Sequence, residues 1–364
     1  MASMATVASS PSMTALAKSS SISPKFPNLQ NPNPLPFPNA NNENPKSISI
    51  FHPLRRSPAI SKSSSSSLPD PIAFPLPPKS QSLKSRLAAG ETLYGLFLLS
   101  ASPILAEIAG FAGYDYVVID MEHGPGGISD ALPCLHALAS TGTAAVLRLP
   151  ETSAASAKKA LDLGPQGIMF PMIDDARSAE LAVSFSRFPP RGVRGSAHTI
   201  VRASAYGIDD GYLARCEEEL LLMCQIESAT AADNIEAIAA VDGVNCLQMG
   251  PLDLSASMGY LWNPGDRKVR EKLREVERRV LALRKADGET AKASPPYLSG
   301  FSMPFERPED LKMRGYHMVA GAVDVGMFRK AAVEDVLSFR RAETEIREED
   351  GVNDQDGDRS YWSE

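Results

Sequence analysis

Residues 114–125, YDYVVIDMEHGP, join an apolar run to a cluster of polar side chains. The first six residues read as a buried β-strand, and Asp120, Glu122 and His123 follow close behind. Charged groups beside a buried strand are costly unless they are paired, hydrated or bound to a metal. Their presence at the end of this strand predicts a functional site, and the other strands of the chain indicate its kind.

The pattern of an apolar run followed by a helical segment repeats along residues 83–342. Seven more apolar runs read as strands: TLYGLFLLS, AAVLRLP, GIMFPMI, LLLMCQIE, VNCLQMG, LSGFSM and MVAGAV. Helical segments such as SPILAEIAGFAG and DDARSAELAVSFSRF lie between them. Apolar strands that alternate with helices are typical of a parallel sheet buried on both faces, and this number over about 250 residues predicts a single (β/α)₈ TIM barrel. An open doubly wound sheet is the alternative, but no glycine-rich phosphate turn follows the first strand.

The two ends of the chain differ from this domain. Residues 1–82 are rich in Ser, Pro and Asn and hold seven Lys and Arg against two acidic residues. An acid-poor, Ser-rich N-terminus is typical of a plant-type transit peptide, so we expect targeting to the chloroplast, or else to the mitochondrion. The alternative interpretation is an ordinary disordered tail. The acidic residues 343–364 predict a disordered C-terminal tail.

Charge and composition exclude several classes of partner. The whole chain carries a net charge of −7 and the basic N-terminal segment carries +5, so the remainder carries −12. A strongly acidic domain is not expected to bind nucleic acid. No membrane span is expected either, because Pro103 and Glu107 interrupt the longest apolar stretch, residues 93–113. The four cysteines form no CxxC pair and are expected to be buried free thiols: Cys134, Cys216, Cys224 and Cys246.

The barrel hypothesis predicts where catalytic groups lie, because active sites of such barrels form at the carboxyl ends of the strands. Polar side chains, which the barrel does not need for packing, stand at the ends of four of the predicted strands. These side chains are Glu122 and His123, Arg148, Gln225 and Glu227, and Asp253. We therefore expect one polar site at this end of the barrel.

The carboxylates of Glu227 and Asp253 could hold a metal ion. Gln225 and Glu227 are two residues apart on a strand and face the same side, and Asp253 follows one strand later. Converging carboxylates and an amide suit a hard cation such as Mg²⁺ or Mn²⁺, and no His or Cys cluster indicates zinc. The alternative is that Glu227 and Asp253 cap the helices that follow them.

The remaining polar groups also allow two interpretations each. Arg148 could recognise a carboxylate or stabilise an enolate, or it could be a structural ion-pair partner. His123 is the only histidine at a predicted catalytic strand end, where it could act as a base or be purely structural.

Several motifs together resemble the HpcH/HpaI aldolase family. They are YDYVVIDMEHGP, FPPRGVRGSA, RASAYG, QIES, NIEAIAAVDGVNCLQMGPLDLSASMGYLWNP and VAGAVDVGMFRKAA. Members are metal-dependent, class II pyruvate aldolases with a barrel related to the phosphoenolpyruvate mutase superfamily. The resemblance covers about residues 83–340. It implies a TIM-barrel lyase.

The resemblance also implies roles at the metal and substrate site. Glu227 and Asp253 would bind the divalent metal, Mg²⁺ or else Mn²⁺ or Co²⁺. Gln225 would lie at the substrate site, and the backbone around Leu252 and Asp253 would receive the pyruvate carboxylate. Leu252 stands where relatives usually have Ala or Ser, which predicts a tighter or drier pocket.

The same resemblance implies the acid–base groups. Arg148 would contact the keto oxygen of pyruvate, and His123 would be the acid/base residue. Asp162, in KKALDLG, matches the aspartate that orients this histidine in the family.

The implied activity is reversible cleavage of a 4-hydroxy-2-oxo acid to pyruvate and an aldehyde. Two alternatives stay open. One is a citrate-lyase-like or phosphoenolpyruvate-mutase-like lyase that acts on an acyl-CoA or phosphorylated substrate, and the other is a non-catalytic plastid protein that binds a 2-oxo acid. The family also implies a homo-oligomer, a hexamer, with the last helix in the interface.

Overall fold

The computed structural model describes residues 81–285 and 294–357. Within them, eight parallel strands pair in chain order and close into a barrel. The strands are β1 (Leu93–Leu98), β2 (Tyr116–Asp120), β3 (Ala144–Arg148), β4 (Gly167–Phe170), β5 (Leu221–Ile226), β6 (Cys246–Met249), β7 (Tyr297–Phe301) and β8 (Met318–Val323). The predicted TIM barrel and all eight predicted strands are confirmed.

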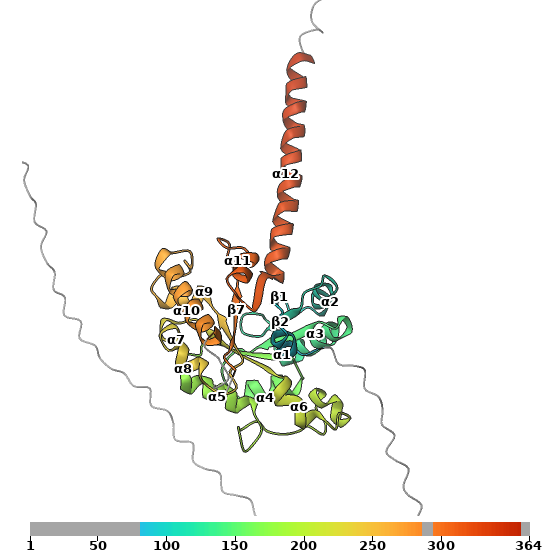
Figure 1. Ribbon diagram of the computed structural model, residues 1–364. Helices are drawn as coiled ribbons and strands as arrows, with labels where there is room; N and C mark the ends of the chain where they lie inside the picture. Colours follow the sequence, from blue (N-terminus) through green and yellow to red (C-terminus); the bar gives the residue numbers. More distant parts are fainter. Residues whose placement is uncertain (1–80, 286–293, 358–364) are drawn as a thin grey trace, which may run out of the picture. The chain divides into compact units, whose positions relative to one another are not determined.

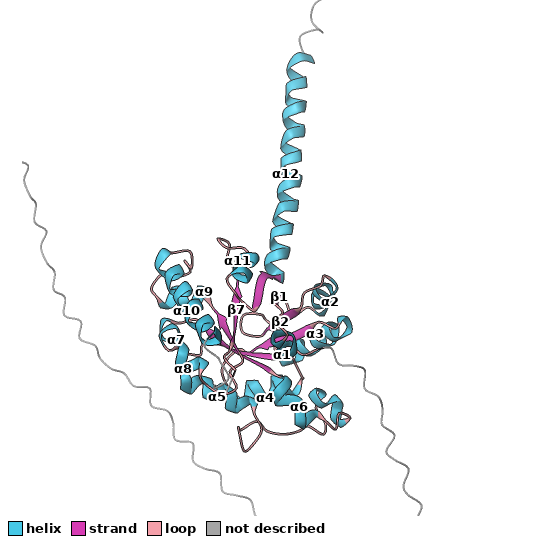
Figure 2. Ribbon diagram, in the orientation of Figure 1, coloured by secondary structure: helices cyan, strands magenta, loops and turns pink. Residues whose placement is uncertain are grey.

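Helices surround the barrel, so that the strands lie at the centre (Figures 1 and 2). Their bounds are α1 (Leu83–Ala88), α2 (Pro103–Phe111), α3 (Ile128–Thr141), α4 (Ala154–Asp162), α5 (Ala176–Ser186), the 3₁₀ segment η1 (Arg202–Gly207), α6 (Tyr212–Glu219), α7 (Ala229–Asp233), α8 (Ile235–Ala239), α9 (Pro251–Ser257), α10 (Arg267–Lys285), α11 (Pro308–Met313) and α12 (Asp324–Gly357). Because each of these parallel strands needs a crossover to the next, the helices cover the outer face and both faces are buried.

Alternation along each strand separates two apolar cores. In β2, Tyr116 and Val118 belong to the core inside the barrel, whereas Val117 and Ile119 belong to the core between the barrel and the helices. Leu83 and Leu87 of α1 join the inner core. Asp120 continues the inward positions of β2, just as Arg148 continues those of β3. The period of the strands therefore directs both side chains into the mouth of the barrel.

The ends of the chain differ from the sequence-based expectation in one respect. The segment expected to be disordered, 343–364, is helical as far as Gly357, where α12 ends. Strong helix formers, the Ala, Glu and Arg of RRAETEIREED, extend this helix beyond the barrel domain. The last residues, 358–364, and nearly all of the predicted transit peptide, 1–82, lie outside the described residues.

Two further expectations can be compared with the described part of the chain. All four cysteines are free thiols, and three of them are buried, Cys216 being the partly exposed one. No described helix combines the length and the apolar character that a membrane crossing needs.

Candidate active site

A pocket of about 220 Å³ opens at the carboxyl ends of the strands. The predicted site residues that line it are His123, Arg148, Gln225, Glu227, Leu252 and Asp253. They come from β2, β3, β5 and β6 and the segments that follow these strands. The structure therefore brings together every predicted site residue except Asp162.

Asp120 organises the first part of this site, with a side chain that is fully buried. Its Oδ1 accepts the backbone N–H groups of Glu122, at 3.0 Å, and His123, at 3.2 Å. The same oxygen accepts Nε of Arg148 at 2.9 Å, and Oδ2 pairs with the end of the guanidinium. One carboxylate thus fixes both the turn that presents His123 and the direction of Arg148.

Arg148 is held on several sides. Besides Asp120, it donates to Oε1 of Gln225 at 3.5 Å, and its Nη1 lies 3.1 Å from Oε2 of Glu122. Its guanidinium also lies 5.1 Å from the centre of the Phe97 ring, a cation–π distance. With its side chain only 11% exposed, Arg148 has a single orientation and presents a fixed positive charge to the pocket.

Glu122 is partly buried next to other acids. Burial raises the pKa of its carboxyl, and the charges of Asp120 and Asp253 add to this effect, whereas Arg148 opposes it. Although Oε2 lies close to Arg148, the direction of the contact makes no hydrogen bond, so this buried oxygen has no hydrogen-bond partner. It is an unsatisfied acceptor at the edge of the site.

Glu227 is the most deeply placed acid of the pocket. Its Oε1 accepts the backbone N–H of Met172 at 2.7 Å, and its Oε2 accepts Nε2 of Gln225 at 2.6 Å. The pKa of Glu227 is raised to about 7, chiefly by burial; the hydrogen bond from Met172 opposes the shift and the nearby charge of Glu122 contributes to it. Met172 has a φ of 51°, which is uncommon for a residue with a side chain and aims its N–H at the carboxylate.

Gly250 allows the close approach of β6 to this carboxylate. A Cβ at this position would lie 2.7 Å from Oε2 of Glu227. Since real Cβ atoms do not approach so closely, a larger residue would displace the carboxylate.

The alternative that Glu227 and Asp253 are helix caps is wrong. Ser228 caps α7, because its side chain accepts the N–H of Ala231, and Gly250 occupies the cap position of α9. Asp253 lies in the first turn of α9 with its side chain at the pocket. Both carboxylates are therefore available to a ligand.

The charges of the pocket suit a divalent cation. Two carboxylates, those of Glu227 and Asp253, line the pocket together with Arg148, which pairs with two further carboxylates, those of Asp120 and Glu122. Among the described residues no group of three His, Cys, Asp or Glu side chains is arranged to hold a metal. Mg²⁺ is commonly held by one or two carboxylates, with substrate and water as its other ligands. Glu227 and Asp253, beside an unsatisfied acidic oxygen, fit that pattern.

Comparison with known proteins agrees with this geometry. Residues 93–331 match the sequence profile of the family described as HpcH/HpaI aldolase/citrate lyase. The chain belongs to this family. It is 37% identical over 263 residues to the hydroxypyruvate/pyruvate aldolase of Cupriavidus necator, a match that covers 72% of this chain and 94% of the relative.

Two further members show the extent of the likeness. The 2-keto-3-deoxy-L-rhamnonate aldolase of Escherichia coli K12 is 40% identical over 261 residues, which covers 72% of this chain and 94% of that enzyme. The crystal structure of an HpcH/HpaI aldolase/citrate lyase family protein from Burkholderia cenocepacia superposes with a TM-score of 0.65 at 34% identity, and covers 72% of this chain and all of that one. The likeness thus spans the barrel domain.

Asp162, expected to orient His123, lies elsewhere in this HpcH/HpaI family member. It ends α4, just before β4 begins, and pairs with Arg194 at 3.3 Å; Arg194 in turn donates to the hydroxyl of Tyr212. This is the amino end of the barrel, whereas His123 follows the carboxyl end of β2. Within the single chain Asp162 and His123 thus lie at opposite ends of the barrel, because a helix that returns to the start of the next strand carries its last residues away from the catalytic end; a role of Asp162 toward this histidine stays a prediction.

Glu122 instead is the acid beside His123, with Oε1 4.0 Å from Nε2 of the histidine. Sequence reasoning noted Glu122 without a role and did not find Met172 or Gly250. The histidine side chain is 57% exposed and so can meet a substrate in the pocket.

Proposed function

We propose that the protein is a metal-dependent aldolase that reversibly cleaves a 4-hydroxy-2-oxo acid to pyruvate and an aldehyde. The observation that carries this proposal is a single pocket that combines two available carboxylates, Glu227 and Asp253, with a fixed cation, Arg148, and an exposed imidazole, His123. The aldolases named among the relatives support the same class of reaction.

Each group has a defined task in this reaction. A divalent cation held by Glu227 and Asp253, for which we propose Mg²⁺, would polarise the keto group of the substrate. Arg148, fixed by Asp120, stabilises the negative charge that develops on the enolate oxygen. Gln225 holds the Glu227 carboxylate in place through its amide N–H.

His123 moves the proton. It accepts the proton of the 4-hydroxyl group as the C3–C4 bond breaks, so that C4 becomes the aldehyde carbonyl and the bonding electrons pass into the pyruvate enolate. Protonation of the enolate at C3 then gives pyruvate. In the reverse direction the same imidazole protonates the new alkoxide.

The polar groups disfavour a phosphorylated or acyl-CoA substrate. Arg148 is the one arginine or lysine among the described residues that line the pocket, and Asp120 already engages it. A phosphate group would need further cationic partners.

Exchange of the pyruvate methyl protons into D₂O tests the proposal, because it reports enolisation without knowledge of the aldehyde. We expect exchange that needs a divalent metal and is lost in Glu227→Gln, whereas Glu218→Gln, a matched change at an exposed position on α6, should retain it. A well-folded wild-type protein that binds metal but exchanges no protons would favour the non-catalytic alternative.

We also propose that the chain forms a homo-oligomer, a hexamer by family likeness, through α12. Apolar side chains on this helix are 44–74% exposed in the single chain: Val325, Met327, Phe328, Val333, Val336, Leu337 and Phe339. Exposed apolar surface of this kind marks protein interfaces. Light scattering on the wild type and on Phe328→Glu with Phe339→Glu checks it, and a monomeric wild type would refute it.

For localisation we propose the chloroplast, from the composition of residues 1–82. A fluorescent fusion to this segment should enter chloroplasts, and deletion of residues 1–75 should leave a soluble, active enzyme. Entry into mitochondria alone would replace this proposal with its alternative.

A further inference from the structure

The active-site pocket is polar on one arc of the barrel and apolar on the other. The polar side chains follow β2, β3, β5 and β6, whereas β1, β7 and β8 contribute apolar ones. The apolar arc consists of Phe97, Leu99, Phe301, Met303 and Val323. Phe97 and Phe301 meet edge to face with ring centres 5.6 Å apart, so β1 and β7 form a continuous wall.

The polar groups near this wall are already engaged. Gln248 accepts the hydroxyl of Ser299 at 2.6 Å and donates to the carbonyl of Met249 at 3.2 Å. Arg148 is bound to Asp120. The described pocket thus offers no uncommitted cation that could pair with a second carboxylate or a phosphate on the substrate.

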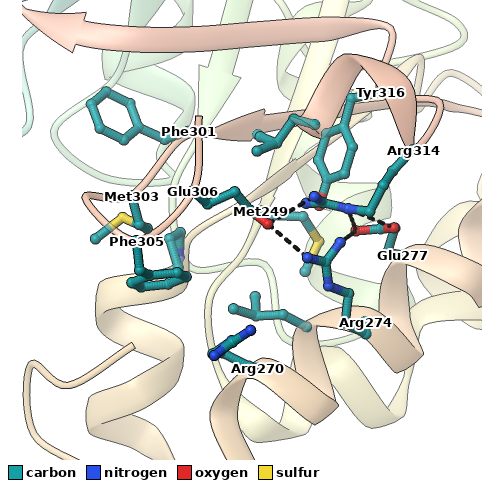
Figure 3. Close-up of a pocket in the computed structure, with 14 residues that line it drawn as sticks. Met249, Arg270, Arg274, Glu277, Phe301, Met303, Phe305, Glu306, Arg314 and Tyr316 are labelled. Atoms are coloured by element: carbon teal, nitrogen blue, oxygen red, sulfur yellow. Dashed lines mark hydrogen bonds and ion pairs between the residues drawn. The ribbon is translucent and has the colours of Figure 1, made fainter. Parts of the chain in front are cut away.

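The segment between β7 and α11 connects this wall to a partly buried network of charged side chains. Met303 lines the active-site pocket, and three residues later Glu306 lines a small cavity of about 30 Å³ behind it. Figure 3 shows Met303 and the network arginines on opposite sides of Glu306. Phe301 and Met303 line both cavities, as do Met249 and Pro251 at the end of β6, so the β7–α11 segment forms one side of the partition between them.

Glu306 is fixed by two arginines from different elements. Its Oε1 lies 2.7 Å from Nη2 of Arg274, on α10, and 2.7 Å from Nη1 of Arg314, which follows α11. Both arginines also pair with Glu277, at 3.4 and 3.0 Å (Figure 3). Two arginines and two glutamates therefore link the segment to α10 and to the start of β8.

The two glutamates of this network are sheltered from solvent, whereas the side chains of Arg274 and Arg314 are 37% and 22% exposed. The side chain of Glu277 is 7% exposed and that of Glu306 is 16% exposed. Buried ion pairs lose much free energy when one partner is removed, because the other charge stays buried. Glu306 thus holds its segment in one position, whereas the neighbouring Phe305 is half exposed.

We propose that the β7–α11 segment selects the aldehyde part of the substrate, with Met303 as the specificity residue and Glu306 as the residue that positions it. This inference rests on the proposed aldolase function. Pyruvate occupies the polar arc, so the substituent on C4 meets the apolar arc. The chemical class selected is an aldehyde with a short apolar chain, in preference to one that carries a carboxylate, phosphate or several hydroxyls.

The test measures aldol addition of pyruvate to three aldehydes: butanal, glyceraldehyde and succinic semialdehyde. Wild-type kcat/KM should be highest for butanal, since burial of a second carboxylate without a partner is unfavourable. Met303→Gln, which keeps the length of the side chain, should lower the preference for butanal over glyceraldehyde about 10-fold. Met313→Gln, a matched change at a position that is 74% exposed on α11, should leave the preference unchanged.

Glu306→Gln tests the positioning role. It should lower kcat/KM for butanal on the order of 10-fold by raising KM, because a displaced apolar wall no longer fits the alkyl chain of the aldehyde. Glu306→Asp, which retains the charge, should recover part of the loss, and the exposed Glu309→Gln should have no effect.

Exchange of pyruvate protons into D₂O separates the possible failures. Wild-type protein without exchange would overturn the aldolase function itself. Two results would overturn the specificity inference alone. One is a Met303→Gln protein that exchanges protons but keeps the aldehyde preference of the wild type, and the other is a wild type that prefers succinic semialdehyde. Equal loss of exchange and of addition in Glu306→Gln would show a general structural role and overturn the positioning part.

Discussion

Asp120→Asn is the change that most directly tests how the site is built. Asp120 accepts two hydrogen bonds from Arg148 and two from backbone N–H groups, and its side chain is fully buried. Asparagine has nearly the same shape but no charge, and its amide would turn a donor toward the guanidinium or toward the backbone N–H groups. The substitution therefore removes the charge partner of Arg148 and loosens the turn that presents His123.

The size of the effect follows from these contacts. Removal of one partner from a buried ion pair costs about 3–5 kcal/mol. Arg148 keeps a second carboxylate, Glu122, 3.1 Å away, so we expect the lower end of this range, about 3 kcal/mol. For a domain of this size, that loss corresponds to a fall in Tm of about 6–12 °C. Misplacement of Arg148 and His123 should also reduce turnover by on the order of 10²-fold.

Thermal unfolding and pyruvate exchange, measured side by side, check this prediction. Asp210→Asn, a matched change at an exposed aspartate, should alter neither quantity. In a double-mutant cycle, Asp120→Asn with Arg148→Gln should destabilise less than the sum of the two single changes, because the pair is already broken in each. A folded Asp120→Asn protein with wild-type Tm and wild-type exchange would refute the role that we assign to this carboxylate.

Other predictions concern the metal, the base and the pH dependence of stability. Glu227→Gln or Asp253→Asn should each reduce cleavage by several orders of magnitude, as should EDTA, with activity restored by Mg²⁺, Mn²⁺ or Co²⁺; full activity after exhaustive chelation would contradict the metal site. His123→Ala should lose activity by about 10²- to 10⁴-fold and still bind metal and pyruvate, as pyruvate titration and a thermal melt can show. Burial lowers the pKa of His317 from 6.5 to about 4, and Arg284 adds to the effect. Because the unfolded chain then binds the proton more readily, stability should fall by about 1–2 kcal/mol as the pH drops from 6.5 to 4, after allowance for partial exposure. His317→Asn should flatten this slope in urea titrations, and a slope unchanged by the substitution would contradict the assignment.

The fold was predictable because its signal repeats. Eight apolar runs, each followed by a helical segment, allow few arrangements, and the alternation along β2 places Tyr116 and Val118 on one side and Val117 and Ile119 on the other. The C-terminal end was predicted less well. Acidic composition suggested disorder after residue 342, but the same residues have high helix propensity, and the structure continues α12 through them to Gly357.

The site was predictable to the extent that its residues stand at strand ends. His123, Arg148 and Glu227 follow this rule and meet in one pocket. Met172 did not stand out, since it contributes a backbone N–H whose direction depends on an unusual φ and not on its side chain. In the single chain Asp162 lies away from this pocket, since a match to a family motif contains no information on which end of the barrel a helix reaches.

The arrangement of charge indicates that ligands would stabilise the site. Burial raises the pKa of both Glu122 and Glu227, the charge of Asp253 raises both, and the charge of Glu122 raises that of Glu227, so these acids repel one another. A structural core would not retain such a group, since replacement by apolar residues of similar size would be neutral or stabilising. Bound cation and 2-oxo acid would relieve the repulsion and so stabilise the folded state in proportion to their occupancy. Relief of this repulsion thus adds to the binding of cation and 2-oxo acid on the polar side of the pocket, whereas the apolar arc across from it selects by shape and by the cost of burying polar groups.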